Sequence, residues 1–318
     1  MRWLIVSSTQ QRVDHSVDVD ADYETVFDLV ADVARRPQFQ LSAVHAQVLH
    51  SNEKGDLVQH WSLAGDCAVR TWRSVRRADR PGHRITFADL DVDPPAGKIR
   101  ADWVFTELAP GRTRIELSNV VEAPSDADLG PLLDRLRLES KEHLDTLRDT
   151  AERRAELDDL VVSFTDPLFV AGSVEDAYDY LYRADLWPER IPHVVGLALT
   201  EEVPGIQFFD MDTQGPDGST HSVRSVRICR PPHLIVYKQI TLPTMLDAHT
   251  GHWRFTETRE GVVVEARHTS TIKRSALSQF GGATTIDEAR RYLRRLLSGH
   301  SMINLRLAKT FAEERAGF

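Results

Sequence analysis

The two halves of the chain open with the same order of apolar and polar positions. In the first half, Val13, Val17 and Val19 alternate with polar residues, which is the period of a half-buried strand. Asp22, a candidate N-cap, then begins an amphipathic segment with the spacing of a helix. In the second half, Ser173-Val174-Glu175-Asp176 has capping-box spacing and begins the equivalent helix. Each half is therefore predicted to start with a short strand and a helix.

Turn signals divide the middle of each half into short strands, which predicts an antiparallel meander. Each half then ends in a long helical pattern, which begins at Ser125 in the first half and at Thr285 in the second. The turn signals are Arg80-Pro81-Gly82-His83 and Ala109-Pro110-Gly111-Arg112 in the first half, and Arg230-Pro231-Pro232 and Glu260-Gly261 in the second.

An internal repeat relates the two halves. Arg73-Ser74-Val75-Arg76 recurs as Arg224-Ser225-Val226-Arg227, 151 positions later, and the same offset carries Pro37 onto Pro188. After one deletion, Trp103 falls on Trp253 at an offset of 150. Self-similarity that holds over so long a register indicates a tandem duplication of one domain.

The order of strand, helix, meander and long closing helix predicts an α+β domain in which a curved antiparallel sheet grips one helix. We expect two such helix-grip domains, residues 1–154 and residues 155–318, in agreement with about 150 residues per domain. This architecture commonly encloses a cavity between the helix and the sheet. Such a cavity is the usual site for a small molecule.

Composition and charge narrow the functional classes. The chain is 41% hydrophobic and 27% charged, which is the balance of a globular protein. Its net charge of -9 argues against nucleic acid as a partner, because such binding depends on Lys and Arg. The two cysteines are far apart, and the apolar run Met1–Val6 is too short for a signal peptide or a membrane span. The sequence predicts a soluble cytoplasmic protein without a membrane partner, a disulfide framework or a zinc site.

Familiar catalytic motifs are absent from the sequence. The chain lacks GxSxG, GxGxxG, a P-loop and HExxH, so classical hydrolase, dinucleotide-binding and kinase functions are not indicated. The spacing His249-Thr250-Gly251-His252 has no companion Cys or carboxylate cluster, and we therefore expect no metal site there.

The strand around the repeated string carries the strongest candidate residues. If its arginines face outward, they are solvated charges. Trp72 on the same face, and Trp103 and Trp253 on the neighbouring strands, favour an inward orientation into a cavity with aromatic walls. Alternation places Arg70, Trp72, Ser74 and Arg76 on one face, with His221, Val223, Ser225 and Arg227 as their counterparts in the second copy.

The helix-grip layout, the tandem copies, Trp187-Pro188, the Ser225-x-Arg227 strand and the Trp253 strand resemble the two-domain aromatase/cyclases of bacterial type II polyketide synthesis, in the Bet v 1-like START superfamily. The resemblance covers nearly the whole chain. It implies first-ring aldol cyclisation, joining carbons 7 and 12, and dehydrative aromatisation of a reduced poly-β-ketone tethered to an acyl carrier protein. It implies neither cofactor nor metal, and it implies synthase and ketoreductase components as further partners.

By position, the resemblance implies that the Ser and Arg pair and the cavity Trp of each copy belong to the site. The second copy is the better candidate for the chemistry because it adds Trp187, Arg267, His193, Tyr237 and His268. His300 and Asn304 lie four apart on the closing helix and could face the same cavity. The expected catalytic residues are Arg227, Ser225, Arg267, His193 and Tyr237. The expected substrate-binding residues are Trp187, Trp253, His221 and His268 in the second copy, and Trp72, Ser74, Arg76 and Trp103 in the first.

Two other functions remain open at this stage. One is a non-catalytic START-like carrier of a hydrophobic small molecule, which would line its cavity almost wholly with apolar groups. The other is a scaffold within the synthase complex, which would have sealed cavities. An acidic carrier protein would need a local basic patch, and the closing helix could supply one with Arg290, Arg291, Arg294 and Arg295.

Overall fold

The chain folds into two compact units, Met1–Arg154 and Ala155–Phe318. The computed structural model describes residues 8–92, 96–124, 128–214, 218 and 220–318. The apolar run at Met1–Val6 and the helix start expected at Ser125 lie outside the described residues. No helix in the described part of the chain combines the length and apolar character that crossing a membrane requires.

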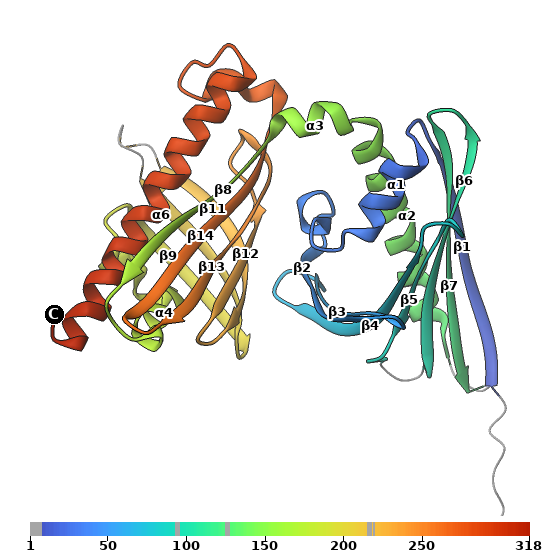
Figure 1. Ribbon diagram of the computed structural model, residues 1–318, viewed down its shortest axis with the longest axis horizontal. Coiled ribbons are helices and arrows are strands. Elements are labelled where there is room, and N and C mark those ends of the chain that lie inside the picture. The colour runs from blue at the N-terminus through green and yellow to red at the C-terminus, as the bar shows by residue number, and fades with distance from the viewer. Residues whose placement is uncertain (1–7, 93–95, 125–127, 215–217, 219) are drawn as a thin grey trace, which may run out of the picture. The chain divides into compact units, whose positions relative to one another are not determined.

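The first unit is a seven-stranded antiparallel sheet with one long helix (Figure 1). The strand order across the sheet is β1-β7-β6-β5-β4-β3-β2, so every consecutive pair from β2 to β7 is a hairpin. Its elements are β1 (Ser8–Val19), α1 (Tyr23–Ala31), the 3₁₀ helix η1 (Arg36–Gln38), β2 (Ala43–Asn52), β3 (Gly55–Leu63), β4 (Val69–Asp79), β5 (Arg84–Asp89), β6 (Lys98–Ala109), β7 (Arg112–Pro124) and α2 (Gly130–Glu152).

The second unit repeats this architecture. Its strand order is β8-β14-β13-β12-β11-β10-β9, which is the order of the first sheet position by position. The predicted duplication of an α+β domain is therefore confirmed. After α3 (Arg154–Leu160), its elements are β8 (Val161–Val170), α4 (Val174–Tyr182), η2 (Ala184–Leu186), α5 (Trp187–Arg190), β9 (Val194–Val203), β10 (Ile206–Gln214), β11 (Thr220–Arg230), β12 (Leu234–Thr241), β13 (Leu246–Thr258), β14 (Gly261–Ile272), η3 (Arg274–Gln279) and α6 (Ile286–Ala316).

The helices begin at the polar residues that the sequence marks as caps. Asp22 Oδ1 accepts a hydrogen bond from Thr25 N at 2.7 Å before α1, and Ser173 Oγ accepts one from Asp176 N at 3.0 Å before α4. Thr285 caps α6 in a reciprocal capping box. These caps satisfy main-chain N–H groups that have no partner inside the helix.

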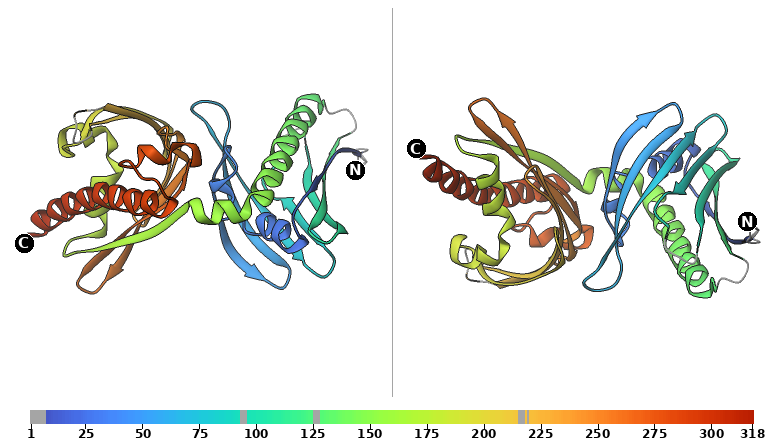
Figure 2. Two further views of the ribbon diagram at one scale, coloured as in Figure 1. Left: turned by 90° about the horizontal axis from the view of Figure 1, so that it is seen from above. Right: turned by 90° about the horizontal axis from the view of Figure 1, so that it is seen from below.

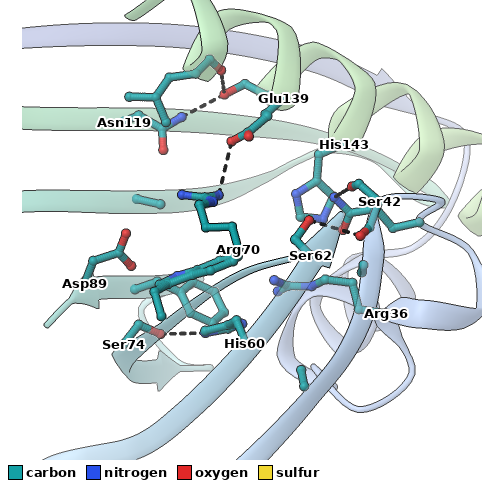
Figure 3. A pocket seen from close by; sticks show the side chains of 18 of the residues that line it. Arg36, Ser42, His60, Ser62, Arg70, Ser74, Asp89, Asn119, Glu139 and His143 are labelled. Carbon is teal, nitrogen blue, oxygen red and sulfur yellow. Dashed lines mark hydrogen bonds and ion pairs between the residues drawn. The ribbon is translucent and has the colours of Figure 1, made fainter. Parts of the chain in front are cut away.

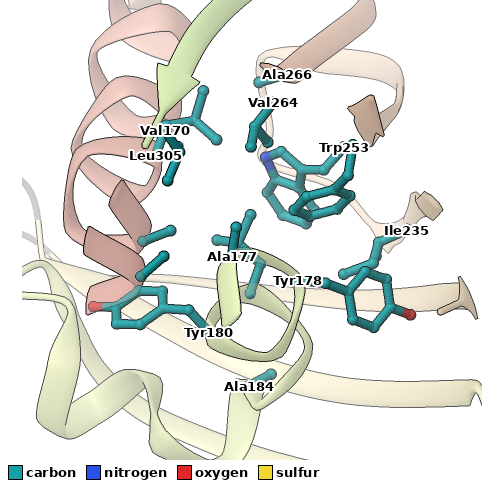
Figure 4. Close-up of a cluster of buried hydrophobic side chains, with 14 of the residues drawn as sticks. Val170, Ala177, Tyr178, Tyr180, Ala184, Ile235, Trp253, Val264, Ala266 and Leu305 are labelled. Atoms are coloured by element: carbon teal, nitrogen blue, oxygen red, sulfur yellow. The ribbon is translucent and has the colours of Figure 1, made fainter. Parts of the chain in front are cut away.

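Each long helix lies against the inner face of its own sheet (Figure 2) and packs an apolar stripe against it. Figure 4 shows part of this core in the second unit, including Leu305 of α6. The stripes are spaced three and four residues apart, so they occupy one side of the helix. The residues that reach the core are Leu144, Leu147 and Ala151 from α2, and Leu305, Ala308 and Ala312 from α6. The remaining inner surface of each unit is available for a site.

Candidate active site

The first unit encloses a cavity of about 150 Å³ between its curved sheet and α2 (Figure 3). The walls are aromatic at Trp61, Trp72, Phe87 and Trp103. Aromatic walls with a few convergent polar groups are typical of a small-molecule site. The polar side chains that line the cavity come from η1, β3, β4, β5, β7 and α2, and include Arg36, His60, Arg70, Ser74, Asp89, Asn119, Glu139 and His143.

A stack of side chains covers the β3 and β4 part of the wall. The Arg70 guanidinium lies 4.1 Å from the centroid of the Trp72 ring, and the His60 ring is stacked on Trp72 at 4.8 Å. His60 Nε2 lies 2.8 Å from Ser74 Oγ. Burial, and then the nearby arginine charges, lower the pKa of His60 to about 3, so its ring is neutral. Trp72 and Ser74 thus lie in the wall, on the inward face that alternation favours.

Arg36 and His143 bring unsatisfied polar atoms into this cavity. Arg36 Nε and Nη2 and His143 Nε2 are buried, and no residue in the described part of the chain bonds to them. Burial, and then the Arg76 charge, lower the pKa of Arg36 to about 10, so the guanidinium stays charged at neutral pH. Burial lowers the pKa of His143 well below the usual histidine value, so this ring is neutral. Unsatisfied buried atoms are costly, and a substrate oxygen or proton would satisfy them.

Helix α2 completes the polar wall on the side opposite the sheet. Glu139 Oε2 lies 3.6 Å from Arg70 Nη2, and this pair spans the cavity. Asn119 Nδ2 donates to Ser140 Oγ at 2.7 Å, and Ser140 Oγ donates to Leu136 O at 2.6 Å. These bonds fix the register of α2 against β7 and so the positions of the residues that α2 directs into the cavity.

Arg227, the repeated arginine of the second unit, is surrounded by hydrogen-bond acceptors of the fold. Arg227 is fully buried, and its guanidinium donates to Leu181 O at 2.9 Å and to Tyr182 O at 2.6 Å, at the end of α4. Its Nε donates to Gln207 Oε1 at 3.0 Å, and the guanidinium carbon lies 5.1 Å from the centroid of a Trp187 ring. Arg227 therefore ties the last turn of α4 to the sheet, which differs from the catalytic position expected for it.

Arg76 occupies the equivalent position in the first unit. It donates to Ala31 O at the end of α1 and forms an ion pair with Asp56 on β3. Because these partners hold its guanidinium beneath α1, Arg76 is not among the residues that line the cavity. Arg76 lies on the inward face of β4 but outside this cavity, and the substrate-binding role expected for it stays a prediction.

A chain of hydrogen bonds links the sheet of the second unit to α6. Tyr237 Oη lies 2.8 Å from His268 Nδ1, and His268 Nε2 lies 2.6 Å from Ser301 Oγ. His249 joins this chain, with Nε2 at 3.2 Å from His268 Nδ1 and Nδ1 at 3.0 Å from Gln239 Oε1. The structure thus brings Tyr237 and His268 together in a buried, uncharged network.

Two tryptophans adjoin this network. Trp187 and Trp253 meet edge to face with 6.1 Å between ring centroids, and the Tyr237 ring centroid lies 5.2 Å from that of Trp253. Gly251 on β13 makes room for this group, because a Cβ there would collide with the Tyr237 hydroxyl. Ser225 is buried on β11. The predicted residues of the second copy therefore form a largely aromatic interior.

We expect the second unit to lose stability as the pH falls below about 6.5. Burial lowers the pKa of His249 to about 4, and burial followed by the His249 charge lowers that of His268 to about 3. Because the unfolded chain binds these protons and the folded chain does not, each histidine costs about 1.4 kcal/mol per pH unit until the folded-state pKa is reached. Urea unfolding above and below that pH measures the slope.

The matched variant is His268→Asn, which recreates the Asn119–Ser140 contact of the first unit. This variant should fold at neutral pH and show a flatter loss of stability with acid than the original chain. Equal slopes for the two proteins would contradict the role given to His268.

Of three further residues expected in the site, two are exposed and one stacks on the closing helix. Arg267 is exposed on the outer face of β14, where it bonds to side chains of β8, because the residue that follows it faces the interior. His221 is exposed at the beginning of β11. His193 precedes β9 and stacks on His300 with 4.9 Å between centroids. The structure thus places Arg267 and His221 at the surface, and the catalytic and binding roles expected for them stay predictions.

The basic patch expected on the closing helix is only partly available. Arg290 donates to main-chain carbonyl groups of α3 and β8, and Arg294 forms an ion pair with Asp166 at 2.7 Å. Arg291 and Arg295 are exposed. The patch is thus reduced to two exposed arginines, a weak basis for docking an acidic protein.

Matching contacts align the closing helices of the two units. Ser140 bonds to Asn119 in the first unit as Ser301 bonds to His268 in the second. Each serine also donates to the carbonyl four residues earlier in its helix. The helices therefore correspond at an offset of 161, instead of the 151 of the repeated string.

This offset explains why sequence reasoning missed part of the cavity. With it, Glu139 and His143 fall on His300 and Asn304, which the sequence did single out. The charged cavity residues of the first unit have neutral or histidine counterparts in the second. The pairs, from strand register and helix alignment, are Arg36 and Trp187, Arg70 and His221, Asp89 and Gln239, and Glu139 and His300.

Known proteins resemble this chain over nearly its whole length. The family model described as "Polyketide cyclase / dehydrase and lipid transport" matches residues 10–152. The granaticin polyketide synthase bifunctional cyclase/dehydratase of Streptomyces violaceoruber is 36% identical over 311 residues, which covers 96% of each chain. The actinorhodin polyketide synthase bifunctional cyclase/dehydratase of Streptomyces coelicolor is 35% identical over 314 residues, which covers 95% of this chain and 97% of that one.

Two crystal structures share both domains. The di-domain ARO/CYC StfQ of the steffimycin pathway is 51% identical with a TM-score of 0.87, covering 96% of this chain and 100% of that one. The di-domain ARO/CYC BexL of the BE-7585A pathway is 32% identical with a TM-score of 0.85, covering 95% and 99%. The chain therefore belongs to the two-domain aromatase/cyclases of type II polyketide pathways.

Proposed function

We propose that this chain is a polyketide cyclase/dehydratase whose chemistry takes place in the cavity of the first unit. Its substrate is a reduced poly-β-ketone tethered to an acyl carrier protein. The first ring closes by aldol addition between carbons 7 and 12, and loss of water then gives the arene. The relatives named as bifunctional cyclase/dehydratases support the reaction class. The observation that carries the choice of cavity is the charged, unpartnered guanidinium of Arg36.

The cavity residues match what an aldol reaction needs. The Arg36 N–H groups stabilise the negative charge that develops on a carbonyl oxygen as its neighbouring carbon is attacked. His143, neutral and without a partner in the described part of the chain, accepts the proton that the attacking methylene loses. Trp72 and Trp103 limit how the chain can fold, which decides the carbons that meet.

The polar lining favours an enzyme over the two alternative functions. A carrier of hydrophobic ligands needs an apolar wall, whereas this cavity places Arg36, Arg70, Asp89 and Glu139 around a small volume. A scaffold needs no cavity. In the second unit the counterparts of these residues are Trp187, His221, Gln239 and His300, which supports binding or packing there instead of ionic chemistry.

Reconstitution tests the proposal. A minimal polyketide synthase with its carrier protein and a ketoreductase is combined with the full chain, and the products are compared with those formed without it. We expect the protein to convert a mixture of shunt products into one compound with an aromatic first ring. Doubly labelled acetate units then locate the new carbon–carbon bond by NMR coupling.

Two outcomes would overturn parts of this proposal. Identical products with and without the protein would support a carrier or a scaffold. Saturable binding of the polyketide without turnover would then favour the carrier. A bond between carbons other than 7 and 12 would refute the regiochemistry and leave the reaction class in place.

A further inference from the structure

The first cavity contains a second carboxyl group besides Glu139. Asp89 is the last residue of β5, lies opposite Ser74 on β4, and lines the cavity. Its carboxylate accepts a hydrogen bond from the Trp72 indole. The strand register places Gln239 at the matching position of the second unit, where no ionisable group stands. The carboxyl group therefore distinguishes the cavity of the first unit from the matching region of the second.

The surroundings of Asp89 separate it chemically from Glu139. Glu139 forms an ion pair with Arg70, whereas Asp89 accepts a hydrogen bond from the Trp72 indole N–H. Burial, with a smaller contribution from Glu139, raises the pKa of Asp89 to about 7 against the opposing effects of Arg70, Trp72 and Arg135. Around neutral pH, Asp89 therefore carries a proton for a substantial fraction of the time.

Removal of water from the closed ring requires such a group. The first ring product is a β-hydroxy ketone, and its hydroxyl is a poor leaving group unless it receives a proton as the carbon–oxygen bond breaks. The two unpartnered groups described above, the Arg36 guanidinium and the neutral His143 ring, supply charge stabilisation and a proton acceptor. Neither group supplies a proton. Arg36 holds its protons too tightly because its pKa is about 10, and the neutral His143 ring acts as a base.

We propose that Asp89 is the proton donor for the dehydration half of the reaction, in a site whose function is the one proposed above. The ring carbon next to the carbonyl loses its proton to His143 Nε2, and its electron pair forms the new double bond. The carbon–oxygen bond breaks as the hydroxyl takes the Asp89 proton and leaves as water. The Trp72 N–H stabilises the Asp89 carboxylate left behind, and exchange with solvent moves the proton from His143 back to Asp89.

The first test is Asp89→Asn in the full chain, assayed in the reconstituted system. The amide keeps the shape of the side chain and an oxygen that accepts from Trp72, but it cannot donate an acidic proton. We expect ring closure to continue and dehydration to slow by about 10²–10⁴-fold, so the hydroxyl-bearing cyclic compound accumulates, one water heavier than the arene. Unchanged formation of the arene would refute the role of Asp89.

The pH profile supplies a readout that a purely structural role would not change. In the original chain, dehydration should slow as the pH rises past about 7, because Asp89 loses its proton. Trp72→Phe removes the hydrogen bond that favours the charged carboxylate, so this falling limb should move to higher pH. If the dehydration rate falls at the same pH in both proteins, the assignment of Asp89 as the proton donor is wrong.

Asp91→Asn is the matched control. Asp91 stands two residues away, is exposed, and pairs with Arg73 at 2.7 Å outside the cavity. The Asp91→Asn variant should leave both ring closure and dehydration unchanged. If the original chain does not alter the synthase products at all, the proposed function itself fails. If it forms the arene and Asp89→Asn does so equally well, only the proton donor is wrong.

Discussion

Replacement of Arg36 by methionine should lower the rate of ring closure by about 10²–10³-fold while the folded state keeps its stability. The guanidinium has two nitrogens without a partner in the described part of the chain, and burial lowers its pKa to about 10. An unpaired buried charge opposes folding, so an apolar side chain of similar length should hold the free energy of unfolding constant or raise it. Activity and stability would then change in opposite directions, which is typical of a functional group.

The measurement combines the reconstituted cyclisation assay with urea unfolding of the same protein. Arg73→Met is the control, because Arg73 lies on the outer face of β4 and pairs with Asp91 away from the cavity. It should change neither quantity appreciably. A marked loss of stability in Arg36→Met, or cyclisation at the original rate, would contradict the assignment of Arg36 to the site.

The fold was predictable because the duplication makes each weak signal appear twice. The polar residues Asp22 and Ser173 mark equivalent helix starts, and the shared string Arg73–Arg76 and Arg224–Arg227 fixes the strand register. Both sheets accordingly have the same strand order. Local rules are sufficient here, since hairpins and caps involve residues close in sequence.

The site was less predictable because it depends on how the closing helix lies against the sheet. Glu139 and His143 enter the cavity only through the register that Ser140 fixes, and longer connecting sequence before α6 hides their match to His300 and Asn304. Alternation along a strand likewise predicts which face of the sheet a side chain lies on, but not whether the side chain reaches the cavity. Trp72 lines the cavity, whereas Arg76 on the same face lies beneath the end of α1.

The proposal of the first unit as the reaction site departs from the ranking expected from sequence, for a physical reason. The second copy offers more tryptophan and histidine, yet Trp187 packs against Trp253 and His268 bonds to Ser301 within the core. The first copy offers fewer candidate residues in sequence. However, Arg36 Nε and Nη2 there are buried without a hydrogen-bond partner in the described part of the chain. Unsatisfied charge is visible only once the neighbours of each residue are known.

Replacement of Arg227 by methionine should destabilise the second unit by about 3 kcal/mol or more, since it leaves several buried acceptors without a partner. Those acceptors are Leu181 O, Tyr182 O and Gln207 Oε1, all bonded to this one guanidinium. The end of α4 would lose its attachment to the sheet. A fall in activity would then follow the fall in stability, in contrast to the result expected for Arg36.

The control for this variant is Arg224→Met on the same strand. Arg224 pairs with Asp210 at 2.6 Å at the surface, and exposed pairs contribute about 1 kcal/mol at most, so its unfolding curve should stay close to that of the original chain. Urea unfolding followed by tryptophan fluorescence measures both variants. If Arg227→Met unfolds like Arg224→Met but loses cyclisation, the repeated arginine acts on the substrate, and its assignment as the attachment of α4 is wrong.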